Sequence, residues 1–379
     1  MKIMHDVRGI TPGIILAMAT TLAAGCGDDG SAEGGTSTGE DPSTGTAMSP
    51  STGNTQETDG PTSPGTSTGP DSETETDSAD TSTGSTGPEI CDQASIELPD
   101  DDFFPEGTAY DAEGVLYVAS LANGSLVRAT PCESEVEELV ASGGPLRNPV
   151  GMIVDDANGW LIVCDSDFSF MTPPSIDVLE LDSGNLVATH EFDAVGFCND
   201  LALDGDGNVY ATDSAGARVL RVQAADLDSD SPAETWVTDP DFEVGEGEFG
   251  LNGIAYDDNG SLYVVNFQQG EMHRITIEAS GDAGAITPIT IDGGPLMNPD
   301  GMKWMGDGTL LVIEGGLTAL SRVTLDGDNA SSEVVQDGFD FPTTFALLDG
   351  SAWVAQGQLD HFLDGSAPEP PFVVTRVAL

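Results

Sequence analysis

The sequence predicts an all-β protein: a six-bladed β-propeller with four-stranded antiparallel blades, preceded by a disordered linker. The first observation is a pattern that recurs six times between residues 104 and 356, in which a turn, an apolar strand, a glycine-bearing turn and a second apolar strand follow one another. The turn glycines that align the six copies are Gly114, Gly159, Gly207, Gly260, Gly308 and Gly350. Repeats with the spacing of these glycines are typical of proteins in which each copy forms one supersecondary unit.

The second observation is that each copy contains four expected strands. They cover residues 108–110, 115–119, 125–129 and 136–140 in the first copy, and residues 254–256, 262–265, 272–277 and 286–291 in the fourth. Four short antiparallel strands at this spacing are what a propeller blade requires. Residues 372–377 can form the outer strand of the last blade, so we expect ring closure to depend on packing rather than on an N-terminal strand.

The third observation concerns two columns of aligned positions. Seven to nine residues before each reference glycine stand Glu106, Val150, Asn199, Asn252, Asp300 and Thr343. Six residues after each glycine stand Ser120, Asp165, Asp213, Asn266, Glu314 and Gln356. The entry of the first strand and the exit of the second lie at the same end of an antiparallel hairpin, so the two columns are expected to be neighbours. A radial arrangement directs both columns toward one axis.

The first column contains hard oxygen donors that suit a metal ion. Glu106 and Asp300 are carboxylates, and Asn199 and Asn252 are amides. This set, without His or Cys, favours Ca²⁺ or another divalent cation, and Ca²⁺ accepts a mixed, water-completed oxygen shell more readily than Mg²⁺. The alternative is that Asn and Asp precede the strands as turn formers, which explains Asn252 but not Glu106.

Composition limits the domain count and the classes of partner. The net charge of -56 arises from 66 acidic and 10 basic residues, so the chain would repel nucleic acid. Aromatic residues and most aliphatic runs follow Cys91, which predicts one globular domain over residues 91–379. We expect this domain to be a monomer that binds a small-molecule substrate.

The N-terminal residues 1–26 have the features of an export signal. A basic start at Lys2 and Arg8 precedes an apolar stretch that is too short for a comfortable membrane span. Residues 22–26 resemble a bacterial lipobox, in which Cys26 becomes lipidated; the alternative is an ordinary cleaved signal with an incidental cysteine. We expect an exported protein, anchored by lipid at the bacterial cell envelope or cell surface, whose globular domain is extracytoplasmic.

Residues 27–90 are rich in Ser, Thr, Gly, Pro and acidic residues, so they cannot bury enough apolar surface to fold and are expected to be a disordered linker.

The cysteines after this linker are Cys91, Cys132, Cys164 and Cys198. An even set in an exported chain predicts two disulfides, with three pairings open. We favour Cys164 with Cys198, because both should lie at one end of adjacent units, which leaves Cys91 with Cys132. The histidines lack metal-ligand spacing, so zinc is not expected.

Four short phrases carry a family resemblance. They are Phe104-Pro105-Glu106-Gly107, Asn199-Asp200, Leu251-Asn252-Gly253 and Pro299-Asp300-Gly301-Met302. From about Cys91 onward, the chain resembles the family of senescence marker protein (regucalcin), gluconolactonase and luciferin-regenerating enzyme. The resemblance implies a divalent cation at the top of the central tunnel, held by Glu106, Asn252 and Asp300, with Asn199 as a nearby ligand or substrate contact. It also implies Ca²⁺-dependent hydrolysis of a lactone or related ester, with Asp300 as the candidate base.

The chain departs from this family at one position. Members that act on sugar lactones often carry an Arg two places before the Asn-Asp pair, where this chain has Phe197, an apolar wall in place of a polar anchor. Arg147 is a candidate substitute, or a surface charge in a loop. Asp165, Asp213 and Asn266 are candidates for substrate contact, or they hydrogen-bond one another.

Two further function classes stay open from the sequence. One is a non-catalytic surface propeller that binds a ligand and contains a structural calcium, because one fold hosts many functions. The other is a strictosidine-synthase-like enzyme that needs no metal.

Overall fold

The structure is a computed structural model that describes residues 93–133 and 135–379. The predicted export signal, Cys26, the linker 27–90 and Cys91 lie outside these residues. In the part of the chain that is described, no helix has the length and apolar character needed to cross a membrane.

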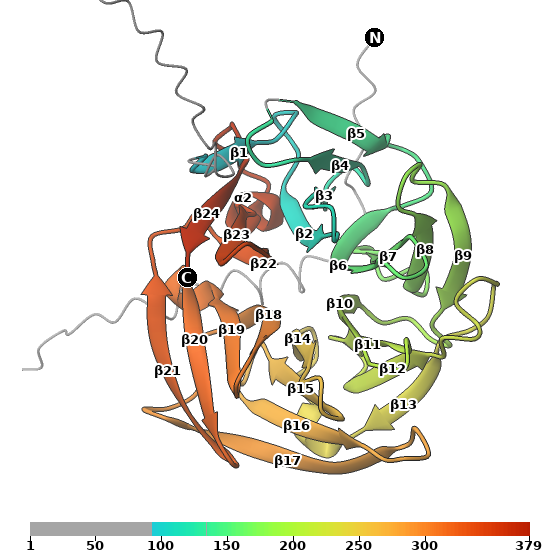
Figure 1. The fold of residues 1–379 in the computed structure, drawn as a ribbon, viewed down its shortest axis with the longest axis vertical. Helices are drawn as coiled ribbons and strands as arrows, with labels where there is room; N and C mark the ends of the chain where they lie inside the picture. The colour runs from blue at the N-terminus through green and yellow to red at the C-terminus, as the bar shows by residue number, and fades with distance from the viewer. Residues whose placement is uncertain (1–92, 134) are drawn as a thin grey trace, which may run out of the picture. The chain divides into compact units, whose positions relative to one another are not determined.

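The described residues form antiparallel sheets arranged around one axis (Figure 1). Three of the four-stranded sheets consist of consecutive strands. The first sheet contains β2 (Pro105–Tyr110), β3 (Leu116–Ser120), β4 (Leu126–Ala129) and β5 (Val136–Val140). The second contains β6 (Asn148–Asp155), β7 (Trp160–Ser166), β8 (Ser175–Glu180) and β9 (Leu186–Glu191). The third contains β10 (Cys198–Leu203), β11 (Val209–Asp213), β12 (Arg218–Val222) and β13 (Glu234–Thr238).

The next strands form one eight-stranded sheet with two antiparallel halves. The first half contains β14 (Leu251–Tyr256), β15 (Ser261–Asn266), β16 (Met272–Ile277) and β17 (Ala283–Asp292). The second contains β18 (Pro299–Gly306), β19 (Thr309–Glu314), β20 (Ala319–Asp326) and β21 (Asn329–Gln336). The halves meet where residues 290–292 of β17 pair in parallel with residues 329–331 of β21.

The expected all-β propeller arrangement is therefore confirmed, whereas six separate four-stranded sheets are not what the structure shows. The reason for the fusion is strand length: β17 has 10 residues and β21 has 8, against 5 in β5 and in β13. These longer outer strands extend far enough for their free edges to meet.

The last four-stranded sheet overturns the expectation about ring closure. Its order is β22 (Pro342–Leu348), β23 (Ser351–Gln356), β24 (Val373–Ala378) and then β1 (Ser95–Glu97). The outer strand is thus β1 from the N-terminal side, and the prediction that β24 would be outermost was wrong. Pairing with β1 covers the edge of β24, which would otherwise expose unpaired backbone groups.

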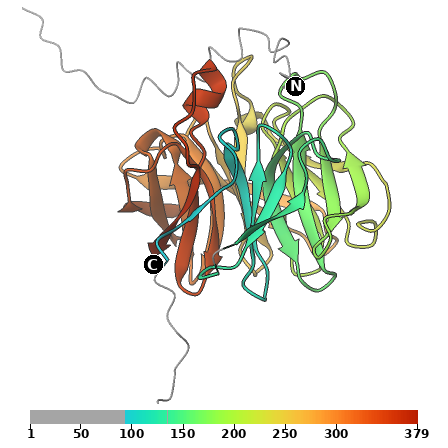
Figure 2. The ribbon, with the colours of Figure 1, turned by 90° about the horizontal axis from the view of Figure 1, so that it is seen from above.

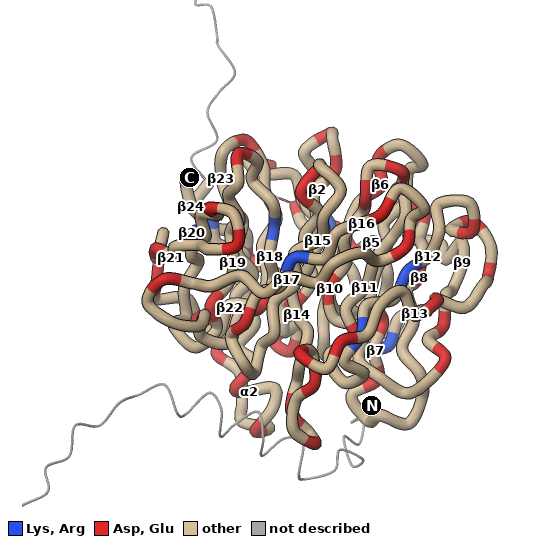
Figure 3. The backbone as a smooth tube through the Cα atoms, turned by 90° about the horizontal axis from the view of Figure 1, so that it is seen from below, with Lys and Arg blue, Asp and Glu red and all other residues tan. Residues whose placement is uncertain are grey.

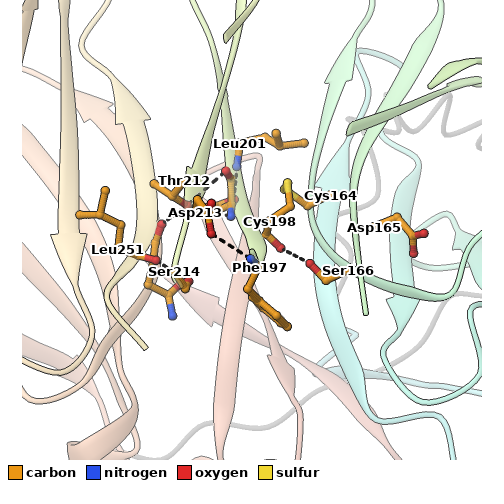
Figure 4. The surroundings of a disulfide bond; sticks show 12 residues. Cys164, Asp165, Ser166, Phe197, Cys198, Leu201, Thr212, Asp213, Ser214 and Leu251 are labelled. Atoms are coloured by element: carbon orange, nitrogen blue, oxygen red, sulfur yellow. Dashed lines mark hydrogen bonds between the residues drawn. A yellow bond between two sulfur atoms is a disulfide. The ribbon is translucent and has the colours of Figure 1, made fainter. Parts of the chain in front are cut away.

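The favoured disulfide is confirmed. Cys164 at the end of β7 is bonded to Cys198 at the start of β10, with 5.2 Å between their Cα atoms (Figure 4). In the chain-entropy model, closing a loop of this size stabilises the fold by about 3 to 4 kcal/mol. Cys132 is also disulfide-bonded, and Cys91, its expected partner, lies outside the described residues.

Three short helices complete the described elements: η1 (Pro240–Phe242), η2 (Gly315–Leu317) and α2 (Leu359–Asp364). The last of these lies in the connection between β23 and β24, and it projects beyond the strands at one end of the ring (Figure 2). The innermost strands contact one another in a closed series, β2, β6, β10, β14, β18 and β22. The candidate site is built on this inner series.

Candidate functional site

A β-bulge interrupts every inner strand just after its entry. In β2 the register shifts between Pro105 and Thr108, so that Glu106 and Gly107 together face a single residue of β3. The same shift occurs at the equivalent place in the other inner strands. The first bulged residues are the first column: Glu106, Val150, Asn199, Asn252, Asp300 and Thr343. Because a bulge changes the direction of a side chain, it explains how this column is directed to the axis.

The second bulged residue allows neighbouring inner strands to approach closely. At Gly107, a Cβ atom would lie 1.9 Å from the carbonyl oxygen of Val150 on the next inner strand. At Gly253, a Cβ atom would lie 2.3 Å from the carbonyl oxygen of Asp300. These distances are far below van der Waals contact, so glycine is required at both places. Close approach of the strands brings the first-column side chains together.

The four predicted donors meet at one cavity. Glu106, Asn199, Asn252 and Asp300 all line it, and all four are buried. The structure thus brings together residues that are separated by up to about two hundred positions in the chain. We call these four residues the polar floor.

Sequence reasoning did not assign a role to two charged residues beside the polar floor. Asp200 takes the second bulged position of β10, where most of the other repeats have glycine, and it is buried. Its Oδ1 lies 3.6 Å from Nζ of Lys303 on β18. The signal was present in the sequence, because Lys303 is the only lysine after Lys2 in this acidic chain.

The two carboxylates of the polar floor have perturbed pKa values. Burial raises the pKa of Glu106 well above its usual range, and the charges of Asp300 and Asp200 raise it further. Burial and then the charge of Asp200 raise the pKa of Asp300 to about 8, against a hydrogen bond from the Asn252 side chain that lowers it. Both shifts have the same cause: negative charge is concentrated in a desolvated place.

These residues fit a divalent cation. Oε2 of Glu106 and Oδ1 of Asn252 are buried and have no hydrogen-bond partner among the described residues. The carboxylates of Glu106, Asp200 and Asp300 with the ammonium of Lys303 give a net charge of -2 when all are ionised, which one divalent cation neutralises. No group of three or more His, Cys, Asp or Glu residues arranged for a metal occurs in residues 93–379 other than 134. The polar floor differs from such a group because half of its donors are amides.

The second column has a different role in the structure. Asp165 accepts hydrogen bonds from the backbone N–H groups of Arg147 (2.7 Å) and Asn148 (2.9 Å). Asp213 accepts one from the backbone N–H of Phe197 (2.8 Å; Figure 4). Each carboxylate thus fixes the loop that leads into the inner strand of its own sheet.

Not all of the candidate substrate contacts lie at the cavity. Phe197 and Asn199 line it, whereas Asp165, Asp213, Asn266 and Arg147 are not among the lining residues. Asn266 donates to the carbonyl of Phe242 (3.4 Å) and accepts from neighbouring backbone N–H groups. The guanidinium of Arg147 is held by Asp165, at 2.8 Å.

The walls of the cavity are apolar. They consist of Leu121, Val150, Phe168, Phe197, Phe249, Phe267, Gly315, Phe341, Pro342, Leu359 and Leu363. Leu359 and Leu363 belong to α2, so this helix contributes two side chains to the cavity wall. The helix projects from one end of the ring (Figure 2). A polar floor beneath apolar walls can hold a hard cation and a carbonyl group while excluding much of the surrounding water.

Comparison with known sequences gives a partial match. The family model "Strictosidine synthase-like, N-terminal" matches residues 92–129, the part of the chain that includes β1, β2, β3 and β4. No curated protein matches.

Comparison with solved structures identifies proteins of the same fold. The major allergen Mala s 1 of Malassezia sympodialis is 16% identical, with a TM-score of 0.60 over 75% of this chain and 96% of that chain. A gluconolactonase from Xanthomonas campestris is 17% identical (TM-score 0.54, 74% and 88% covered). The calcium-binding protein regucalcin from Agrobacterium tumefaciens is 14% identical (TM-score 0.54, 76% and 95% covered). The predicted resemblance to the regucalcin and gluconolactonase family is therefore confirmed at the level of the fold.

Proposed function

We propose that this chain is a Ca²⁺-dependent hydrolase that acts on a lactone or related ester in the cavity above the polar floor. One observation carries the proposal: the four buried floor residues, two of whose oxygen atoms have no hydrogen-bond partner among the described residues, form the base of an apolar cavity. With Asp200 and Lys303 beside them, these groups carry a net charge of -2 when all are ionised. The fold supports it, because proteins of this fold include a gluconolactonase and a calcium-binding protein.

In this proposal, Glu106, Asn252 and Asp300 hold the cation, and Asn199 is a further ligand or a substrate contact. When bound, the cation supplies Lewis acidity that polarises the substrate carbonyl and stabilises the developing oxyanion. Lys303 offsets the charge of Asp200 beside the polar floor. Asn252 orients the Asp300 carboxylate by donating a hydrogen bond to it.

Asp300 is the proposed general base. It accepts a proton from a water molecule, whose oxygen bonds to the carbonyl carbon of the substrate. The acyl carbon–oxygen bond of the ring then breaks, and the proton passes to the leaving alkoxide, so that lactone and water give a hydroxy acid. Burial raises the basicity of the Asp300 carboxylate and a bound cation lowers it, so the Asp300→Asn variant described below decides this role.

The finer features of the architecture and location belong to the same proposal. Counting each half of the eight-stranded sheet as one blade gives six blades around the polar floor. We also propose that the protein is exported and attached to a bacterial membrane through lipid on Cys26, which leaves the propeller free to meet small molecules outside the cytoplasm.

A metal-independent enzyme of the strictosidine-synthase-like kind is the second candidate, because the family-model match covers residues 92–129. Chelation separates the two candidates. We expect calorimetry to detect Ca²⁺ binding, and we expect hydrolysis of a lactone and aryl-ester panel to stop in EGTA and to recover with added Ca²⁺. Activity that persists in EGTA would favour the second candidate, and Ca²⁺ binding without any hydrolysis would favour a ligand-binding propeller.

The role of Asp300 needs a separate variant. Asp300→Asn keeps the size of the side chain and removes its basicity, so turnover should fall by at least about 100-fold while Ca²⁺ binding is retained at raised Ca²⁺ concentration. Asp307→Asn, at an exposed turn of the same hairpin, is the matched control and should not alter turnover. Unchanged turnover in Asp300→Asn with Ca²⁺ bound would remove Asp300 from the role of base.

A further inference from the structure

We infer that the cavity selects esters and lactones with an apolar alkyl or aryl body over hydroxylated sugar lactones. The inference rests on the proposed function, because it takes the substrate carbonyl to lie over the polar floor. Apart from the four floor residues, no described residue that lines the cavity contributes a charged or hydrogen-bonding side chain. The walls include five phenylalanines: Phe168, Phe197, Phe249, Phe267 and Phe341.

The chemistry of these walls disfavours a sugar ring. A sugar lactone carries several hydroxyl groups, and each needs a hydrogen-bond partner once it is removed from water. Those hydroxyls that face phenylalanine and leucine side chains would have none, which reduces affinity by on the order of tenfold for each unsatisfied group. An alkyl chain or aromatic ring in the same place gains from burial instead.

The residue that could have supplied a polar anchor is already engaged. The guanidinium of Arg147 donates to Asp165 (2.8 Å), to Thr172 Oγ1 (2.5 Å) and to the carbonyl oxygen of Pro173 (3.3 Å). These contacts hold the loop 167–174, which carries Phe168, against the rest of the second sheet. Arg147 thus acts as a support for the apolar wall.

The aromatic wall is fixed in place before any substrate enters. Asp167 accepts hydrogen bonds from Ser169 (2.8 Å) and Thr172 (3.0 Å), and these hold the turn around Phe168. The ring of Phe168 lies 4.9 Å from that of Phe197. The ring of Phe197 lies 4.9 Å from that of Phe249 in turn. A wall with fixed side chains favours a substrate of matching shape, because little ordering remains to be done on binding.

Apolar side chains also lie on α2 and on the loops around the cavity opening. On α2, Phe362 packs between the rings of Phe104 (5.3 Å) and Phe168 (5.4 Å), which holds the leucines of this helix at the cavity. Several exposed apolar residues lie on loops at the same end of the sheets, namely Met171, Val195, Met297 and Leu317. The apolar side chain of Met171 is 78% exposed. An apolar substrate therefore meets apolar surface from the rim to the floor.

Three lactones with the same six-membered ring test the inference. They are δ-valerolactone, δ-decalactone with its added alkyl chain, and glucono-δ-lactone with its hydroxyl groups. With the Ca²⁺-loaded protein, kcat/KM for δ-decalactone should exceed that for δ-valerolactone by at least about tenfold, since several methylene groups become buried. The value for glucono-δ-lactone should be lower than that for δ-valerolactone.

Two variants on one loop test whether the preference for apolar substrates depends on a side chain of the cavity wall. Phe168 lines the cavity, whereas Phe170 lies on the same loop, packs against Phe197 and Phe249, and is not among the lining residues. Phe168→Gln should lower the preference for δ-decalactone over glucono-δ-lactone by about tenfold or more. Phe170→Gln, which makes the same chemical change outside the cavity, should leave this ratio unaltered. Equal effects of the two variants would overturn the assignment of Phe168 to substrate selection.

Binding of the corresponding lactams separates this inference from the proposed function, because lactams are not hydrolysed under these conditions. Preference for glucono-δ-lactone in turnover would overturn the inference and leave the hydrolase in place. If none of the lactones is hydrolysed but the alkyl lactam binds more tightly than the hydroxylated lactam, the proposed function fails and the apolar selectivity is supported. Tighter binding of the hydroxylated lactam, or no binding of either, overturns the inference.

Discussion

Lys303 sets the net charge of the buried cluster at the polar floor. Its ammonium is 3.6 Å from Asp200 and lowers the pKa of Glu106, against the larger effects of burial, Asp300 and Asp200. With Lys303 present, the ionised cluster matches a charge of +2; without it, the cluster matches a charge of +3. We therefore predict that this single residue tunes the proposed metal site between divalent and trivalent cations.

Lys303→Met tests this charge balance, because it keeps the length of the side chain and removes the ammonium. We expect the affinity for Tb³⁺ relative to Ca²⁺ to rise by about tenfold, in keeping with one added charge at short range in a poorly solvated site. Terbium luminescence, titrated in competition with Ca²⁺, measures the ratio. Arg322→Met, which removes a charge that pairs with the exposed Glu333, is the control. A ratio that stays the same in both variants contradicts the charge-balance argument.

Asp177 on β8 is a buried carboxylate away from the polar floor, and it makes stability depend on pH. Burial, and then the charge of Asp165, raises its pKa from 3.8 to about 7 in the folded protein. Between these values the folded state holds a proton that the unfolded state releases, so this residue stabilises the fold at low pH and the effect is lost as pH rises toward 7.

Asp177→Asn removes this titration. The variant should be more stable than the parent at pH 8, by on the order of 1 kcal/mol or more, and the difference should shrink toward pH 4. Urea unfolding at both pH values measures it. Asp182→Asn, at an exposed turn beyond the same strand, controls for the loss of one negative charge and should show no such pH-dependent difference. A destabilised Asp177→Asn at pH 8 would contradict the argument.

At the scale of elements, the repeat pattern predicted most of the site residues but not the β-bulges that orient their side chains. Six aligned glycines were sufficient to find Glu106, Asn252 and Asp300, because identical hairpins place equivalent residues at equivalent positions. The bulges were not predicted, since a bulge adds one residue to a strand and leaves its apolar pattern nearly unchanged. Asp200 was consequently assigned no role from the sequence, although the bulge places it beside the polar floor.

Gly253→Ala tests whether the bulges assemble the site. The added Cβ would lie 2.3 Å from the carbonyl oxygen of Asp300, so β14 and β18 must separate. We expect the free energy of unfolding to fall by about 2 kcal/mol and Ca²⁺ affinity to fall at least about tenfold. Thermal unfolding and calorimetry measure the two effects. At Gly205 a Cβ would meet only the Tyr256 hydroxyl at 3.7 Å, so Gly205→Ala is the control and should change neither stability nor Ca²⁺ affinity. Equal changes in the two variants would contradict the proposal that the bulges assemble the site.

At the scale of the whole described domain, charge and topology were predicted to different extents. Acidic residues are spread over the turns and loops, and basic residues are few (Figure 3), as expected for a chain that repels polyanions. The order of the repeats also follows from the sequence. Strand β1 was missed because only 3 residues form it, too few to show an alternating pattern. Its pairing with β24 depends on a contact between the two ends of the folded domain, which local patterns do not report.

Strand β1 closes the ring of sheets by pairing with β24. Ile96 is the buried residue of this strand and packs in the same core cluster as Phe372 and Val374, whereas Ser95 beside it is exposed. Ile96→Asp places a charge in this core, so the free energy of unfolding should fall by about 3 kcal/mol, and β24 should lose protection from hydrogen exchange before the other strands. Ser95→Asp adds the same charge at the neighbouring exposed position and should change stability by less than about 0.5 kcal/mol. If exchange in β24 rises no more than in β12, a middle strand of another sheet, β1 does not close the ring and the packing of inner strands alone holds it together.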